Sequence, residues 1–178
     1  TAIDARKDAV HVTFEGEHVQ LREASQAPRP LGTIPIVIGG SGPKTMALVR
    51  RHATWWNLPV HEIGKLEALR DQAGDARPSI QQMVAFVPDE SSRSVVAETA
   101  ERRFGTMAGG LVVGIGAELV EHFARLAHRG IERTYVWFCD FAAPETLAAF
   151  GAEVIAAGSH GPGIRTERSA SPARAATG

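Results

Sequence analysis

The sequence predicts an α/β fold built on a parallel sheet. Apolar runs that read as strands alternate with helix-compatible stretches, which is typical of βαβ units. The strand-like runs are residues 34–38, 53–57, 80–87 and 133–138. The chain has 178 residues and 44% hydrophobic content. It is therefore long enough for one domain with a substantial core.

The first run is followed directly by a helix. Residues 34–38 read Ile-Pro-Ile-Val-Ile and do not alternate with polar residues, as expected for a strand covered on both faces. Apolar residues then recur at helical spacing from Met46 onward. Pro43 suits the first helical turn, and Ser41 or Gly42 can cap it. Two glycines therefore lie where a strand turns into a helix.

The later helices follow from apolar periodicity and from their ends. The stretch 116–129 is the clearest, because its apolar side chains form one stripe and Gly130 closes it. The other predicted helices are residues 61–72, 94–104 and 144–154.

The two ends of the chain differ from this pattern. "VTFEGEHVQL", residues 12–21, predicts an extended insertion with a turn at Glu15-Gly16. Residues 158–178 are rich in Gly, Ser, Pro, Ala and Arg, and Ile164 is their only large apolar side chain. We therefore expect a domain over residues 1–157 and a disordered C-terminal tail over residues 158–178.

Composition excludes several functions. The net charge is −1, and no basic stripe or long apolar run favours a nucleic-acid or membrane partner. A single cysteine excludes an internal disulfide, and with no recognisable leader we expect a cytoplasmic protein. Cys139 lies within "TYVWFCDF" and is predicted to be a buried hydrophobe. The histidines show no metal-ligand spacing, so no metal is expected.

The glycine turn has a chemical interpretation. The free N–H groups at a helix start carry partial positive charge and can hold a phosphate. Gly39 and Gly40 would let a phosphate approach the backbone, and Lys44 would add a full charge one turn in. Equally, such a turn can use glycine and serine for backbone geometry alone. The spacing matches neither a dinucleotide fingerprint nor a P-loop.

Several motifs together resemble one family. They are, in order, "VTFEGEHVQL", "IPIVIGGSGPKTMALV", "RRHATWWN", "GAELVEHFARLAHRGIERTYVWFCD" and "PETLAAFGAEVI". Over residues 10–157 the chain resembles the C-terminal half of the luciferase-like monooxygenases, which are flavin- or deazaflavin-dependent oxidoreductases. This resemblance implies half of a (β/α)8 TIM barrel, with four parallel βα units that correspond to strands five to eight.

The resemblance also implies a cofactor site. Gly39 and Gly40 match backbone contacts to the cofactor phosphate, and Ser41, Gly42 and Lys44 complete the turn. The implied cofactor is coenzyme F420 or FMN. The catalytic residues remain unknown, because in the family most of them come from the first four strands.

Other residues have two interpretations. The family often has Asp and Gly where this chain has Thr54 and Trp55. The Trp55 indole either fills a pocket or closes it, or else Trp55 or Trp56 simply packs under the adjacent helix. Asp140 is either a functional group at the barrel rim or a helix cap, and the cap is favoured. In "FEGEH", Glu15, Glu17 and His18 suggest acid/base chemistry, but the family places this insertion outside the barrel wall, so surface decoration is favoured.

We therefore expect a fragment or truncated form of a luciferase-like oxidoreductase that performs hydride transfer or monooxygenation. The alternative is a non-catalytic half-barrel that serves in binding or assembly. An unrelated open α/β nucleotide-binding domain is disfavoured, because the glycines do not follow its fingerprint.

An open half-barrel also predicts a partner. The edge strands would lack neighbours, and the side chains of Ile36, Ile38, Val136 and Phe138 are expected to face the bare interior. We expect a homodimer or a complementing N-terminal half to cover them.

Overall fold

The computed structural model describes residues 11–25, 27–28 and 30–158. The predicted tail lies outside these residues apart from Gly158. Five strands form one parallel sheet, and each follows the preceding one after a helical connection. They are β3 (Val37–Gly39), β4 (Trp55–Leu58), β5 (Arg77–Phe86), β6 (Leu111–Gly114) and β7 (Arg133–Phe138). The predicted α/β class with parallel βα units is confirmed.

Strand β5 is the centre of the sheet. It pairs with β4 at residues 77–80, with β6 at residues 83–86 and with β7 at residues 79–84. The β5 residues that pair with β7 overlap both those that pair with β4 and those that pair with β6. Strand β7 therefore lies on one edge of β5, and β4 and β6 lie one after the other along the opposite edge. Strand β3 pairs with β4 alone, and β6 and β7 each pair with β5 alone, so within the described residues the sheet has unpaired edges at β3, β6 and β7.

The predicted helices are present with small changes at their ends. They are α1 (Pro43–His52), α2 (Leu66–Ala73), α3 (Arg93–Phe104), α4 (Gly116–His128), α5 (Pro144–Phe150) and α6 (Ala156–Gly158), with a π-helical stretch at Gly151–Ile155 between the last two. Among the described residues, three 3₁₀ segments complete the connections: Val60–Lys65, Glu90–Ser92 and Gly105–Gly110. The predicted helix 61–72 is thus split into a 3₁₀ segment and α2.

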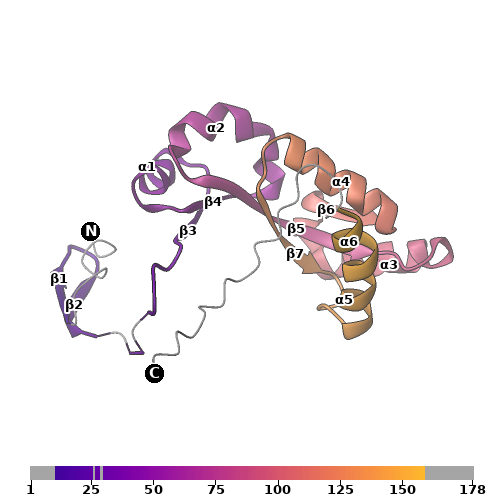
Figure 1. The fold of residues 1–178 in the computed structure, drawn as a ribbon, viewed down its shortest axis with the longest axis horizontal. Helices are drawn as coiled ribbons and strands as arrows, with labels where there is room; N and C mark the ends of the chain where they lie inside the picture. The colour runs from indigo at the N-terminus through magenta and orange to yellow at the C-terminus, as the bar shows by residue number, and fades with distance from the viewer. Residues whose placement is uncertain (1–10, 26, 29, 159–178) are drawn as a thin grey trace, which may run out of the picture.

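One face of the sheet packs on helices. A first cluster joins Trp56, Leu58 and Ile80 of the strands to apolar residues of α1, α2 and α4. A second joins Val84, Phe86 and Phe138 to α4, α5 and the π-helical stretch. Figure 1 shows α2 and α4 along this side of the strands. Large apolar side chains with 3.6-residue spacing on these helices cause this packing.

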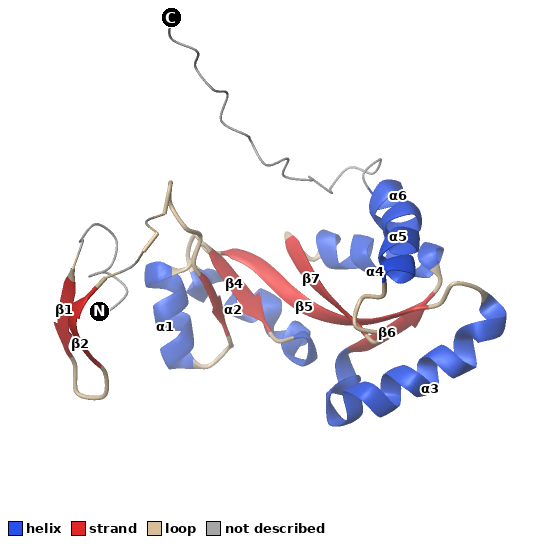
Figure 2. Ribbon diagram, turned by 90° about the horizontal axis from the view of Figure 1, so that it is seen from below, coloured by secondary structure: helices blue, strands red, loops and turns tan. Residues whose placement is uncertain are grey.

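The opposite face is only partly covered. Helix α3 packs over its carboxyl end, where Met83, Ala85, Phe104 and Cys139 form a smaller cluster. Figure 2 shows α3 lying alongside β6. Other parts of this face are accessible: Val37 is 45% exposed, and Tyr135 and Trp137 are each 38% exposed.

The expected orientation of the edge-strand side chains was wrong. Ile38, Val136 and Phe138 point to the helices, where they belong to or contact the two apolar clusters. Their sequence neighbours Val37 and Trp137 occupy the other face. Successive strand residues alternate between faces, so a run without alternating polarity does not reveal which set meets the helices.

The N-terminal insertion is an antiparallel hairpin. Strands β1 (Val12–Glu15) and β2 (Gln20–Ala24) pair with one irregularity between Val12 and Phe14. The hairpin stands apart from the parallel sheet (Figure 1). The predicted extended insertion and its turn are confirmed. Strand β6, by contrast, was not predicted.

Candidate functional site

The glycine turn connects β3 to α1, and its conformation depends on Gly40. This residue has φ +125°, a region that side chains rarely adopt. A Cβ atom there would also lie 3.1 Å from Cγ2 of Thr45. Gly39 and Gly42 are less constrained, since neither has positive φ. Only Gly40 is therefore required by the backbone itself.

Strand β4 holds the turn in place from the neighbouring position. The Gly40 N–H donates to the Asn57 carbonyl at 3.0 Å. The indole Nε1 of Trp56 donates to the Gly40 carbonyl at 2.7 Å. Trp56 is fully buried in the cluster beneath α1 and α2. The turn is thus fixed at both polar groups of Gly40.

The start of α1 presents its N–H groups without a capping side chain. Gly42 is the N-cap, Pro43 follows it, and no side chain caps this helix end. The first turn contains no acidic residue, and Lys44 in it is exposed. The first N–H groups of a helix have no intrahelical acceptor and favour an anion. The start of α1 is therefore a candidate site for an anion.

A carboxylate lies beside the same turn. The Ser41 hydroxyl donates to Oε2 of Glu62, and the Lys65 ammonium donates to Oε1. These two hydrogen bonds, from Lys65 first and then Ser41, hold the pKa of the Glu62 carboxyl below its ordinary value. Glu62 thus remains negatively charged, and it accepts the hydrogen bond of the Ser41 hydroxyl, a group of the expected cofactor turn.

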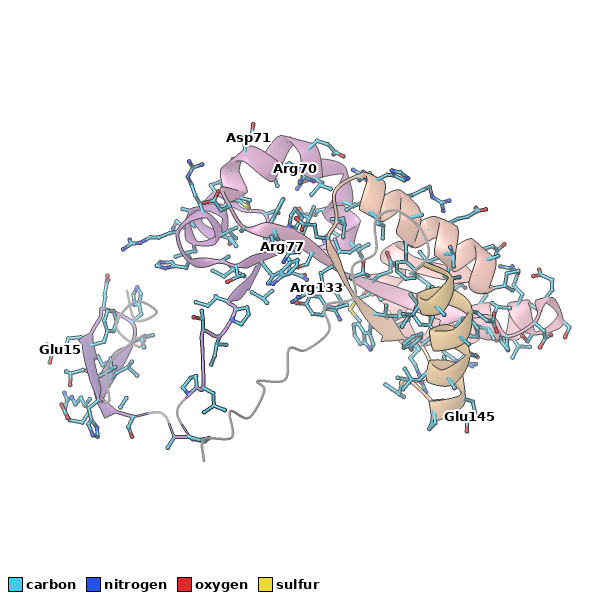
Figure 3. The ribbon with its side chains drawn as sticks, viewed as in Figure 1. Glu15, Arg70, Asp71, Arg77, Arg133 and Glu145 are labelled. Carbon is cyan, nitrogen blue, oxygen red and sulfur yellow. The ribbon has the colours of Figure 1, made fainter. Side chains whose placement is uncertain are left out.

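The two tryptophans of β4 have different roles. Trp56 packs under the helices, as one of the two interpretations expected. Trp55 lies on the opposite face, 3% exposed, beneath the guanidinium groups of Arg77 and Arg133, whose Cζ atoms lie 4.2 Å and 3.8 Å from a Trp55 ring centroid. Figure 3 shows both arginines on the side of the sheet away from Arg70 and Asp71 of α2.

Asp140 has a structural role at the end of β7. Its Oδ1 accepts from the Ala142 N–H at 3.0 Å, and its Oδ2 accepts from the Thr146 hydroxyl. Asp140 thus joins the turn after β7 to the first part of α5, although the N-cap residue of α5 is Ala143. Cys139 is buried as predicted, and burial raises the pKa of its thiol.

The remaining candidates lie apart from the turn. Glu15 lies on the hairpin (Figure 3), and Glu17 and His18 in its loop are 88% and 86% exposed. Across the described part of the chain, no three His, Cys, Asp or Glu side chains are grouped to hold a metal ion. None of the described helices is long and apolar enough to cross a bilayer. A cavity of about 240 Å³ lies between α4 and the C-terminal helical segment, away from the turn.

The comparisons with known proteins point to one family. The sequence profile of the luciferase-like monooxygenases matches residues 4–86, which include the turn and its Trp56 anchor. The resemblance to the luciferase-like monooxygenases is confirmed. No curated protein sequence matched the chain.

Solved structures of an F420-dependent dehydrogenase and of two monooxygenases share the fold. An F420-dependent secondary alcohol dehydrogenase, bound to an F420-acetone adduct, is 15% identical with a TM-score of 0.64, over 87% of this chain and 59% of its own. A monooxygenase from Streptomyces bottropensis is 14% identical with a TM-score of 0.63, over 87% and 58%. EDTA monooxygenase from Chelativorans sp. BNC1 is 10% identical with a TM-score of 0.61, over 86% and 53%.

These similarities establish part of a TIM-barrel luciferase-like fold. The chain spans between 53% and 59% of the length of the three structures. The structure brings Gly39, Gly40, Ser41 and Gly42 into one turn, with Lys44 in the adjoining helical turn. Sequence reasoning did not find Glu62, which no local pattern connects to Ser41. The anchor Trp56 lay within a recognised motif, but nothing in that motif showed its contact with Gly40.

Proposed function

We propose that this chain is the cofactor-phosphate half of a luciferase-like flavin- or deazaflavin-dependent oxidoreductase. The cofactor would be coenzyme F420 or FMN, and the reaction hydride transfer or monooxygenation. The observation that carries the proposal is the turn at Gly40, fixed by Trp56 and open to an uncapped helix start. A cytoplasmic location, expected from the sequence, remains part of the proposal.

In this proposal the residues of the turn bind and orient the cofactor. Backbone N–H groups at the start of α1 hold the phosphate, and the Lys44 ammonium neutralises its charge. A bound flavin or deazaflavin supplies the hydride or oxygen chemistry itself. The chain contributes position, and the groups that contact the substrate belong to the part of the barrel outside the matched half.

Calorimetric titration tests the proposal. FMN, coenzyme F420 and inorganic phosphate are titrated separately into the full chain. We expect binding below millimolar concentration, and Lys44→Ala should weaken it by about 1–2 kcal/mol, as for loss of one charge-assisted hydrogen bond. Arg102→Ala, on the exposed side of α3, is the control for loss of one positive charge. Absence of binding at millimolar ligand would contradict the site.

The second candidate is a non-catalytic half-barrel that serves in binding or assembly. The Ser41–Glu62 hydrogen bond favours it, because a carboxylate beside the turn opposes a phosphate. Glu62→Gln separates the two functions. If the turn binds phosphate, removing this charge should tighten phosphate binding severalfold. If neither the native chain nor the variant binds, the assembly function is the better interpretation.

A further inference from the structure

The turn after β7 has an unusual backbone. Phe141 and Ala142 both have φ +61°, although neither is glycine. The Asp140 carboxylate accepts from the Ala142 N–H at 3.0 Å and from the Thr146 hydroxyl. The Phe141 N–H donates to the Phe138 carbonyl at 3.3 Å. Left-handed backbone at residues with side chains persists only where the surroundings fix it, and such positions cluster at ligand-binding sites.

This backbone presents an exposed aromatic ring. Phe141 is 73% exposed, so most of its ring meets solvent. Glycine or asparagine would reverse the chain here with less strain. An apolar ring in water also gains nothing from burial. The position of the ring, rather than the reversal of the chain, therefore points to a function.

Arg103, one residue before the end of α3, reaches this ring. Its Cζ lies 3.9 Å from the Phe141 ring centroid, and its Nη1 donates to the Cys139 carbonyl at 2.6 Å. A guanidinium group has five N–H donors. Within the described part of the chain Arg103 makes no ion pair, and the neighbouring Asp140 carboxylate is held by the turn itself. Unused donors of Arg103 thus lie beside the exposed ring.

The turn lies at the carboxyl end of the parallel strands. Ligands of parallel α/β sheets bind at this end. The glycine turn lies at the same end, but it follows β3, whereas Phe141 follows β7, and these two strands do not pair with each other. The exposed ring and its arginine are therefore a second feature, separate from the candidate phosphate site.

We propose that Phe141 and Arg103 bind a planar aromatic carboxylate. The ring of the ligand stacks against Phe141, and its carboxylate accepts two parallel N–H groups of Arg103. The planar guanidinium fork matches the geometry of a carboxylate, which a lysine ammonium does not. Under the proposed function this ligand is the substrate. Only that assignment rests on the proposed function, and the binding itself does not.

Three probes separate the contributions of charge and ring. Cinnamate carries both, cinnamyl alcohol keeps the ring without the charge, and 3-cyclohexylpropanoate keeps the charge without an aromatic ring. Each is titrated into the full chain and followed by ligand-detected NMR. We expect a millimolar Kd for cinnamate and affinities at least about threefold weaker for 3-cyclohexylpropanoate and tenfold weaker for cinnamyl alcohol.

Substitutions assign the binding to the two residues. Arg103→Gln should weaken cinnamate binding about tenfold and leave cinnamyl alcohol nearly unchanged, whereas Phe141→Leu should weaken both roughly threefold. Arg103→Lys keeps the charge without the fork, so its Kd for cinnamate should lie between those of the native chain and Arg103→Gln. Arg102→Gln removes the same charge from the next residue of α3, which pairs with Glu98, and should change this Kd less than about twofold.

Several results would overturn the proposal. One is absence of cinnamate binding at millimolar concentration. Another is an equal loss in Arg103→Gln and Arg102→Gln, which would show only a general effect of charge. A third is equal affinity of the native chain for all three probes, a comparison that still decides if Arg103→Gln is unfolded by circular dichroism. These results are separate from the FMN and F420 titrations, since Lys44→Ala lies in the other turn.

Discussion

Replacing Trp56 by phenylalanine tests how the glycine turn is held. The Trp56 side chain is fully buried among Leu58, Ile80 and residues of α1 and α2. Its Nε1 donates to the Gly40 carbonyl at 2.7 Å. Phenylalanine keeps an aromatic ring in the cluster, but it has no N–H group to donate.

The expected loss of stability has two parts. A carbonyl that loses its donor without regaining water costs about 1–3 kcal/mol. The missing pyrrole portion of the ring corresponds to about two buried methylene groups, or ~1.6 kcal/mol. Together these predict that Trp56→Phe lowers the free energy of unfolding by about 2.6–4.6 kcal/mol, a large fraction of the stability of a small domain.

Urea unfolding followed by circular dichroism measures this loss. Trp137→Phe is the matched control, since Trp137 is 38% exposed and lies on the other face of the sheet. We expect the control to lose less than about 1 kcal/mol. If Trp56→Phe were no less stable than the control, the indole would not be anchoring the turn, and the rigidity invoked for phosphate binding would have no basis.

Three further predictions concern stability. Gly40→Ala should lower the free energy of unfolding by about 1–3 kcal/mol, because Gly40 has positive φ and the Thr45 side chain lies close to its Cβ position. Gly42→Ala should lower it less, since Gly42 has φ −70° and no atom within 4 Å of its Cβ position. The urea midpoints of the two variants are compared. Glu118→Ala should lower the melting temperature more than Glu121→Ala, because the Glu118 carboxylate accepts from the Ile115 N–H at 3.1 Å and also pairs with Arg93. Glu121 pairs along its own helix, with Arg125. Equal melting temperatures of the two variants would contradict a capping role for Glu118. Burial, aided by Arg125, lowers the pKa of His122. The contribution of His122 to stability should therefore be complete above its unfolded pKa of about 6.5 and should fall as the pH drops below that value. The free energy of unfolding measured at about pH 7.5 and 5.5 should differ less in His122→Gln than in the native chain, and an unchanged difference would refute this role.

The sequence identified much of the fold because several elements are specified locally. Strand β7 begins and ends at the predicted residues 133 and 138. Helix α4 ends one residue before its predicted end, since its apolar stripe and Gly130 are both local signals. Strand β6 was missed because only four residues form it, directly after Gly109 and Gly110, and its pairing with β5 is non-local.

The candidate site was only partly accessible from sequence. The glycines and Lys44 form one short segment, so their proximity follows from chain connectivity. Glu62 reaches Ser41 from 21 residues away, and the parallel pairing of β3 with β4 brings together the segments that follow these two strands. The same holds for Trp55, whose two arginines come from separate strands. Contacts that depend on tertiary packing leave no local pattern to read.

The central position of β5 has a consequence for how the chain folds. Every other strand of the parallel sheet except β3 pairs directly with it. During synthesis β4 can find its neighbour soon after residue 86 emerges, but β7 pairs with residues 54 positions earlier in the chain. Until then one edge of β5 is bare. The nascent chain therefore passes through an intermediate with a long exposed strand edge, which is the kind of species that chaperones bind and that aggregates when they do not.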